Sequence, residues 1–153
     1  MTILEKKIQQ RSYLWFKNEH VSELLNEGFI NSDNAKALRN VLHANINELP
    51  VFKGVRMPKT IRGMLDGWCR TAISMGLKKG VADFSLKCPV AFDGKEYHFV
   101  EIEFKTTSRK SKQSEWQIKY ELAVNHVGGL YVIIRSFEEF KAFIEELIFL
   151  TRR

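Results

Sequence analysis

The sequence predicts an α/β domain in which helices flank a small mixed β-sheet. The chain has 153 residues, 44% of them hydrophobic, which is typical of one compact domain with a real core. Hydrophobic spacing predicts the element order α-α-α-β-β-α-β-α. No repeat or interdomain linker interrupts this order. We therefore expect a single domain over 1–153, with a helical part over 1–60 and a core with the strands over 61–150.

Helical spacing predicts three helices in the first half of the chain. The first spans 3–25, with a possible break around Asn18, and ends before Gly28. The second begins at Ser32 as N-cap and runs to Pro50 with the apolar stripe Leu38, Val41, Leu42 and Ile46. A third spans 61–80 and ends at glycines, while residues 51–58 fit either a short strand or a loop.

Strand patterns dominate the next part of the chain. Two strands over 80–87 and 97–105 are joined at Asp93-Gly94, a strong hairpin signal. Ser114 and Gln117 form an S-x-x-Q capping box that begins a helix ending near Gly128. A buried strand over 130–134 follows, and a last helix, "SFEEFKAFIEELIFL", begins at Ser136.

The formal net charge is +6, and the excess is uneven. Residues 51–80 contain a single acid, Asp66, among many basic residues, which suggests a positive face for a polyanion. Cys69 and Cys88 have no metal-ligand spacing and are expected to be buried thiols. With no long apolar run and no signal-peptide pattern at the N-terminus, we expect a cytoplasmic protein that does not enter a membrane.

Three charged residues stand out in the predicted strands. Alternation along "YHFVEIEFK" places Glu101, Glu103 and Lys105 on one face, and pairing with the preceding strand can bring Asp83 beside Glu103. Two adjacent carboxylates repel unless a cation bridges them, and oxygen ligands on an open site suit Mg²⁺ or Mn²⁺. A nearby lysine can orient or deprotonate a water, or neutralise charge on a phosphate. This set suits phosphodiester hydrolysis, although an E-x-K pair by itself is more often a solvated strand face.

The segments "MGLKKGVADFSL", "FVEIEFKTT" and "SEWQIKYELAVNHVGGLYVIIRSFEEF" resemble the virus-type replication-repair nuclease (VRR-NUC) family of PD-(D/E)XK nucleases. The resemblance covers roughly 61–147, with a looser match at "LEKKIQQ". It implies a PD-(D/E)XK nuclease-like core, so that 61–150 would be the catalytic part. It also implies a metal-dependent DNA endonuclease, often a homodimer on branched or junction DNA.

Carried over by position, Asp83 and Glu103 resemble the metal ligands, Lys105 the catalytic lysine, and Gln117 the glutamine of the following helix, with Gln113 as the alternative. Glu5 resembles a further metal ligand from the first helix, with Glu19 and Glu23 as alternatives. Ala82 stands where the family usually has proline.

Basic residues near the predicted site are candidates for DNA contact. They are Arg109, Lys110 and Lys112 in one loop, and Arg62, Arg70, Lys78 and Lys79 before the strands. The aromatic residues Trp15, Trp68, Trp116 and Tyr120 fit core positions better than base-stacking ones, and the four histidines share no ligand spacing. Two alternatives remain open: a restriction-type sequence-specific nuclease, and a non-catalytic basic nucleic-acid-binding module.

Overall fold

The computed structural model describes residues 2–45, 59–61, 63, 64, 67, 70, 81–108 and 111–150. Its helical elements are α1 (Ile3–Trp15), the π-helix η1 (Phe16–His20), α2 (Val21–Asn26), α3 (Ser32–Val41), α5 (Glu115–His126) and α6 (Phe137–Glu146). Its strands are β1 (Leu42–Ala44), β2 (Phe84–Leu86), β3 (Val90–Phe92), β4 (Lys95–Tyr97), β5 (Val100–Phe104), β6 (Leu130–Ile134) and β7 (Ile148–Phe149).

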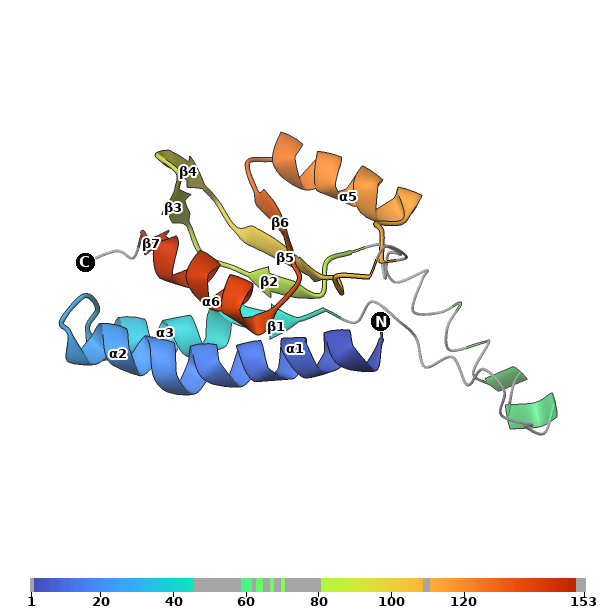
Figure 1. Cartoon of the computed structure of the whole chain (residues 1–153), viewed down its shortest axis with the longest axis horizontal. Helices are drawn as coiled ribbons and strands as arrows, with labels where there is room; N and C mark the ends of the chain where they lie inside the picture. The colour runs from blue at the N-terminus through green and yellow to red at the C-terminus, as the bar shows by residue number, and fades with distance from the viewer. Residues whose placement is uncertain are drawn as a thin grey trace.

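The main sheet has the strand order β1-β2-β5-β6. Strands β1, β2 and β5 pair antiparallel, whereas β6 runs parallel to β5 through the α5 crossover. Figure 1 shows α5 on one side of this sheet, with α1 and α6 on the other. The predicted mixed sheet between helices is therefore confirmed.

Period-two alternation gives the sheet two different faces. Phe84, Ile102 and Phe104 are at most 1% exposed and belong to the large core cluster shared with α1 and α6. The opposite face packs against α5 through a smaller cluster built on Ala82, Val124 and Tyr131. Central strand β5, fully buried, thus presents apolar residues to one layer and its two glutamates to the other.

The predicted first helix is confirmed as a nearly continuous run of α1, η1 and α2. The π-helical segment Phe16–His20 contains Asn18, where the sequence predicts a possible break. Trp15 and Phe16 are buried there, and the Trp15 ring stacks on His20 with centroids 5.0 Å apart. Gly28 follows the helix with φ of 78°, a conformation that favours glycine.

The prediction for the second helix is wrong at both ends. Asn31, not Ser32, is the N-cap, because its side chain accepts from the Asn34 backbone N–H. The helix ends at Val41, and Leu42–Ala44 form edge strand β1 beside β2. Pairing with β2 overrides the helical spacing of Val41 and Leu42.

The Asp93-Gly94 turn is a hairpin turn, with φ of 48° and 71°, but it joins β3 to β4. The sequence predicts that this turn joins the strand after Asp83 to the strand that contains Glu103. Those strands are β2 and β5, and the turn joins neither of them. Strands β3 and β4 form a separate sheet in the order β4-β3-β7. Strand β7 was also missed, because the last helix ends at Glu146 rather than continuing to the end of the apolar run.

Several sequence predictions lie outside the described residues, including most of the third helix over 61–80, the segment 51–58, Trp68 and Cys69. Cys88 is partly buried, and burial raises the pKa of its thiol to about 12. Among the described helices, none is both long and apolar enough to cross a bilayer.

Candidate active site

Adjacent strands bring Asp83 and Glu103 together. Phe84 pairs with Ile102 in the antiparallel β2–β5 ladder, so the preceding residue, Asp83, lies beside the following one, Glu103. Both side chains are buried, at 4% and 2% exposure. This is the juxtaposition predicted from alternation, although ladder pairing rather than the Asp93-Gly94 turn produces it.

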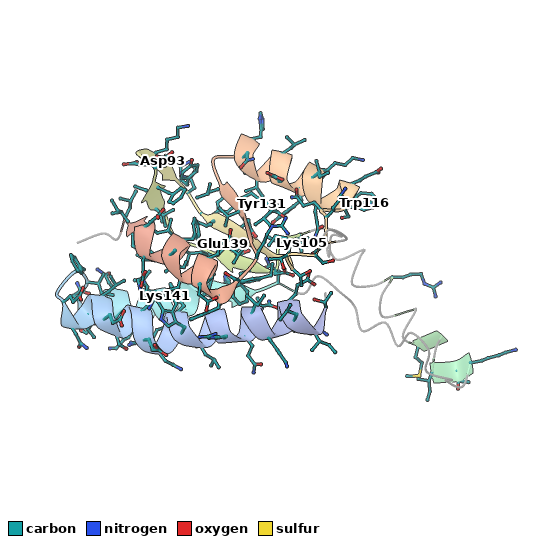
Figure 2. All side chains as sticks on the ribbon, in the orientation of Figure 1. Asp93, Lys105, Trp116, Tyr131, Glu139 and Lys141 are labelled. Atoms are coloured by element: carbon teal, nitrogen blue, oxygen red, sulfur yellow. The ribbon has the colours of Figure 1, made fainter. Side chains whose placement is uncertain are left out.

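Glu103 is held by the two residues predicted to accompany it. Lys105 Nζ lies 2.9 Å from Glu103 Oε1, and the Gln117 side-chain amide donates to the same oxygen. Lys105 Nζ also donates to Gln117 Oε1 at 3.1 Å, which closes a three-membered polar ring. Figure 2 shows Lys105 near Trp116, which lies in the first turn of α5. The other carboxylate oxygen, Glu103 Oε2, is buried with no hydrogen-bond partner among the described residues.

Electrostatics at Glu103 are unfavourable to its ionised form. Burial and then the negative charge of Asp83 raise the pKa of Glu103 to about 7. The hydrogen bond and positive charge of Lys105 act in the opposite direction, while Glu5 adds a smaller repulsion. An added cation at this site would relieve the repulsion between the carboxylates.

Asp83 is fixed to both neighbouring strands. Its Oδ2 accepts from the Phe104 backbone N–H at 2.8 Å, and its carbonyl accepts from the Asn45 backbone N–H at 2.8 Å. Gln9 Nε2, on α1, lies 3.5 Å from the same carbonyl. These contacts hold the Asp83 side chain against the end of β5.

Gln117 reaches the site from the first turn of α5. Ser114 caps the helix by accepting from the Gln117 N–H, and Gln117 Oε1 accepts from the Ser114 N–H at 2.9 Å. The predicted S-x-x-Q capping box is confirmed. The same side chain contacts Glu103 and Lys105, whereas Gln113, the alternative, donates to Glu121 at 2.8 Å.

Glu5 has a structural explanation that sequence reasoning missed. Thr2 and Glu5 form a capping box at the start of α1, with T-x-x-E as its sequence signal. Glu5 Oε1 also accepts from the Thr106 N–H at 3.3 Å and from Ser111 Oγ at 3.1 Å. Burial raises the pKa of Glu5, but hydrogen bonds from Thr2, Ser111 and Thr106 outweigh it, so the pKa is lowered. Glu5 thus ties α1 to the segment after β5, while the alternatives Glu19 and Glu23 are exposed.

Other candidates are only partly placed. Lys112 and Arg70 are exposed, whereas Arg109, Lys110, Arg62, Lys78 and Lys79 lie outside the described residues. The core prediction holds for Trp15, and Tyr120 is partly buried. The core prediction is wrong for Trp116, which is 59% exposed. In the first turn of α5, Gln117 rather than Trp116 faces the sheet.

A buried polar cluster next to the site was not predicted. Glu101 is 1% exposed, and Ser85 Oγ lies 2.8 Å from both of its carboxylate oxygens. Asn45 Nδ2 lies 2.8 Å from Ser85 Oγ and 3.4 Å from Glu101 Oε2. Alternation placed Glu101 on this face, but no local pattern signalled Asn45, which lies far away in the sequence.

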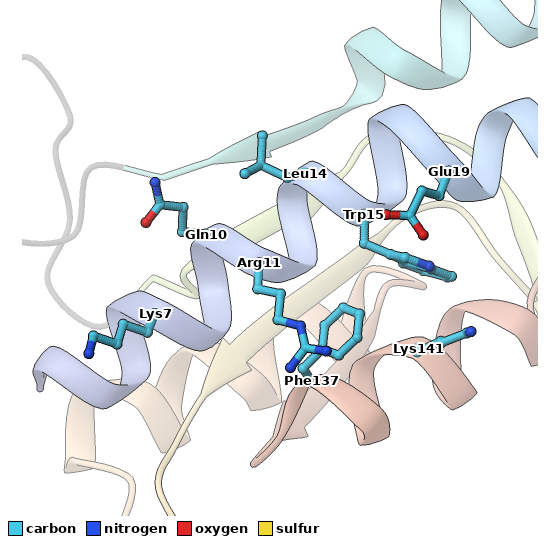
Figure 3. Close-up of a pocket in the computed structure, with 8 residues that line it drawn as sticks. All are labelled: Lys7, Gln10, Arg11, Leu14, Trp15, Glu19, Phe137 and Lys141. Atoms are coloured by element: carbon cyan, nitrogen blue, oxygen red, sulfur yellow. The ribbon is translucent and has the colours of Figure 1, made fainter.

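A separate groove of about 540 Å³ lies between α1 and α6. Figure 3 shows Arg11 beside the Phe137 ring, and its guanidinium carbon lies 3.9 Å from the ring centroid. The groove is lined by Lys7, Gln10, Arg11, Leu14, Trp15, Glu19, Phe137 and Lys141. Neither Asp83 nor Glu103 lines it, so this groove is distinct from the candidate site.

The donor set contains two adjacent carboxylates. Among the described residues, no group of three or more His, Cys, Asp and Glu side chains is arranged to hold a metal ion. Two carboxylates still fit Mg²⁺ or Mn²⁺, since such ions often keep several waters and take only one or two protein carboxylates. The unpartnered buried oxygen of Glu103 is an observation in favour of this fit.

Comparisons with known proteins identify the fold. No protein-family model matches the chain, and no curated protein matches it in sequence. A solved structure described as "VRR_NUC domain protein" is similar over 95% of this chain and 88% of its own length. The TM-score is 0.56 and the sequence identity 16%, so the similarity is one of fold. The predicted VRR-NUC-like fold is therefore confirmed.

Proposed function

We propose that this protein is a metal-dependent DNA endonuclease that hydrolyses phosphodiester bonds. The observation that carries the proposal is the buried Glu103 carboxylate, which lies beside Asp83 and is gripped on one oxygen by Lys105 and Gln117. The second oxygen has no described partner. The VRR_NUC fold of the solved neighbour supports a nuclease of the PD-(D/E)XK type.

Asp83 and Glu103 are the proposed ligands of Mg²⁺ or Mn²⁺. When bound, such an ion supplies Lewis-acid polarisation of the scissile phosphate and neutralises negative charge. In this arrangement Lys105 and Gln117 hold Glu103 through Oε1, which would leave the other carboxylate oxygen available for the ion.

Lys105 is the proposed catalytic cation. Its bonds to Glu103 and Gln117 use two of the three N–H groups that an ammonium has. The third can donate to the attacking water or to a phosphate oxygen, which orients the nucleophile and neutralises developing charge. Gln117 keeps the ammonium in place because its own orientation is fixed by Ser114.

Glu5 is a proposed third acidic ligand, although both of its oxygens already accept hydrogen bonds. Metal ligation through Oε1 requires Thr106 and Ser111 to give up their bonds to that oxygen. Because both donors belong to the segment just after β5, ligation by Glu5 would couple metal binding to movement of this segment.

The substrate is proposed from charge, and the assembly from symmetry. Lys112 is exposed after the Glu5-bound segment and can contact a phosphate, and Arg109, Lys110, Arg62, Lys78 and Lys79 are proposed to extend this contact. We propose branched or junction DNA as the preferred substrate and a homodimer as the active form, since two-fold symmetry presents two sites to two strands. A sequence-specific cutter and a non-catalytic binding module are the alternatives.

The test is cleavage of labelled linear, flapped and four-way DNA with Mg²⁺ or Mn²⁺. We expect wild type to cleave, Lys105→Ala and Glu103→Ala to lose cleavage, and Lys119→Ala, an exposed α5 lysine, to retain it. A preference for four-way or flapped DNA regardless of base sequence supports the structure-specific proposal. Tight binding by wild type without cleavage on any substrate would favour the binding module, above all if Asp83→Ala left the DNA affinity unchanged.

A further inference from the structure

The inference concerns how the chain holds Asp83 in place, and it rests on the proposed function. Residue 82 is alanine, which does not restrict the backbone as proline does. Asp83 also lies just outside β2, which begins at Phe84. The position of its carboxylate therefore depends on what holds the backbone of residues 82 and 83.

Asn45 bonds to both of these peptide units. Its backbone N–H donates to the Asp83 carbonyl at 2.8 Å, which extends the β1–β2 ladder by one residue. Its side-chain amide donates to the Ala82 carbonyl, also at 2.8 Å. Asn45 thus binds the carbonyls on both sides of the Asp83 backbone, and its side chain supplies a bond that the ladder does not.

The Asn45 side chain is in turn held by a buried carboxylate. Asn45 Nδ2 lies 2.8 Å from Ser85 Oγ, and Ser85 Oγ lies 2.8 Å from Glu101 Oε1 and Oε2. A serine hydroxyl can accept from the amide and donate to the carboxylate at the same time, so the three residues form a directed chain of hydrogen bonds.

Burying the Glu101 carboxylate without partners would destabilise the fold. The carboxylate is 1% exposed, and an unpaired buried charge is strongly destabilising. Lys87 Nζ lies 3.6 Å from Glu101 Oε1, and the Tyr120 side chain on α5 forms a hydrogen bond with the same carboxylate. Glu101 lies two residues before Glu103 on β5, but its described partners are Ser85, Asn45, Lys87 and Tyr120 rather than Lys105 or Gln117.

We propose that Asn45, Ser85 and Glu101 are positioning residues that hold the Asp83 backbone so that the Asp83 carboxylate stays beside Glu103. They act through the Ala82 and Asp83 carbonyls and do not touch the ion or the substrate. Glu101 is thereby a structural acceptor and not a third metal ligand, although it shares a sheet face with Glu103.

The test uses the full-length chain and two readouts, the Mn²⁺-induced rise in melting temperature and the kinetics of DNA cleavage. We expect Asn45→Ala to weaken Mn²⁺ binding about 10- to 100-fold, the range usual for residues that support metal ligands. The value of kcat at low Mn²⁺ should fall, excess Mn²⁺ should restore part of it, and KM for DNA should change little. Unchanged Mn²⁺ affinity in a folded Asn45→Ala protein would overturn the proposal.

Two variants separate positioning from ligation. Glu101→Gln keeps an oxygen that accepts from Ser85, so we expect Mn²⁺ affinity close to wild type, whereas Glu101→Leu should lower it as Asn45→Ala does. If Glu101→Gln lost Mn²⁺ binding as completely as Glu103→Gln, Glu101 would be a ligand and the positioning role would be wrong.

The serines provide a matched control. Ser12 and Ser85 are both at most 1% exposed, but Ser12 Oγ has no partner among the described residues. Ser85→Ala should weaken Mn²⁺ binding and Ser12→Ala should not; equal Mn²⁺ affinities would contradict the role of Ser85. If wild type neither binds Mn²⁺ nor cleaves DNA, the proposed function itself fails. If wild type does both and the Asn45 and Ser85 variants match it, only the positioning role fails.

Discussion

At the scale of single residues, Glu103 combines burial, a neighbouring acid and a cation. Burial and Asp83 raise its pKa to about 7, and the Lys105 ion pair lowers the pKa only in part. A carboxyl group whose pKa is higher in the folded than in the unfolded chain stabilises the fold when protonated. Its contribution is complete below the unfolded pKa, near 4.5, and is lost as the pH rises through about 7.

Glu103→Gln should therefore change how stability depends on pH. In metal-free buffer, the free energy of unfolding of wild type relative to Glu103→Gln should fall between pH 4.5 and pH 7, because only wild type must ionise the buried Glu103 carboxyl group. Urea denaturation at a series of pH values measures this difference. Glu96→Gln, on exposed strand β4, is the control. A constant difference between wild type and Glu103→Gln would rule out the proposed electrostatics.

The central residues were accessible to sequence reasoning because their signals are local. Alternation along β5 places Glu103 and Lys105 on one face, and the S-x-x-Q box directs Gln117 to the helix start. The bond from Asn45 to the Ala82 carbonyl and the bond that Glu5 accepts from Thr106 join residues that are far apart in the sequence. No local pattern encodes such contacts, so they emerge only when the sheet is assembled.

At the scale of elements, two capping boxes begin the helices that border the site. Thr2 and Glu5 cap α1, and Ser114 and Gln117 cap α5. In each box the third helical residue also contacts the segment around β5, either at Thr106 or at Glu103. Helix initiation and site geometry are therefore determined by the same side chains.

Ser114→Ala and Ser136→Ala should separate these two roles. Each removes an N-cap side chain, from α5 and α6 respectively, and should lower the free energy of unfolding by about 1 kcal/mol. Only Ser114→Ala removes the bond that the Gln117 backbone N–H donates to the cap, which anchors the residue that holds Lys105, so it alone should reduce kcat for DNA cleavage at saturating metal. Equal kcat values for the two variants would show that the cap does not influence the site.

Several elements were mispredicted because tertiary pairing overrides local spacing. Leu42 continues a helical stripe, yet it lies in β1 and pairs with Leu86 of β2. Ile148 follows an apolar helix, yet it lies in β7 and pairs with Ala91 of β3. The Asp93-Gly94 turn was recognised correctly, but its hairpin partners are β3 and β4. Short edge strands have too few residues to show a period of their own.

At the scale of the whole molecule, the two faces of the mixed sheet have different roles. The face towards α1 and α6 carries the large apolar core, and the face towards α5 carries Glu101 and Glu103. The overall class was predictable from element order, because a strand, a crossover helix and a second strand predict a parallel pair. The separate β4-β3-β7 sheet was not predictable in this way.

This organisation would make the proposed metal binding a property of the folded chain. Asp83 and Glu103 come from different strands, so the unfolded chain lacks the paired carboxylates. An ion that binds only the folded state stabilises it by about 2.7 kcal/mol at a concentration of 100 times Kd. Mn²⁺ should therefore raise the melting temperature without any DNA being present.

The melting temperature as a function of Mn²⁺ concentration is the most direct test of the central claim, because it does not depend on finding the right DNA. We predict a saturable rise for wild type, for Lys105→Met and for the exposed control Glu96→Gln, and no such rise for Asp83→Asn or Glu103→Gln. A wild-type melting temperature that ignores Mn²⁺, or an equal rise in Glu103→Gln, would contradict a metal site at Asp83 and Glu103.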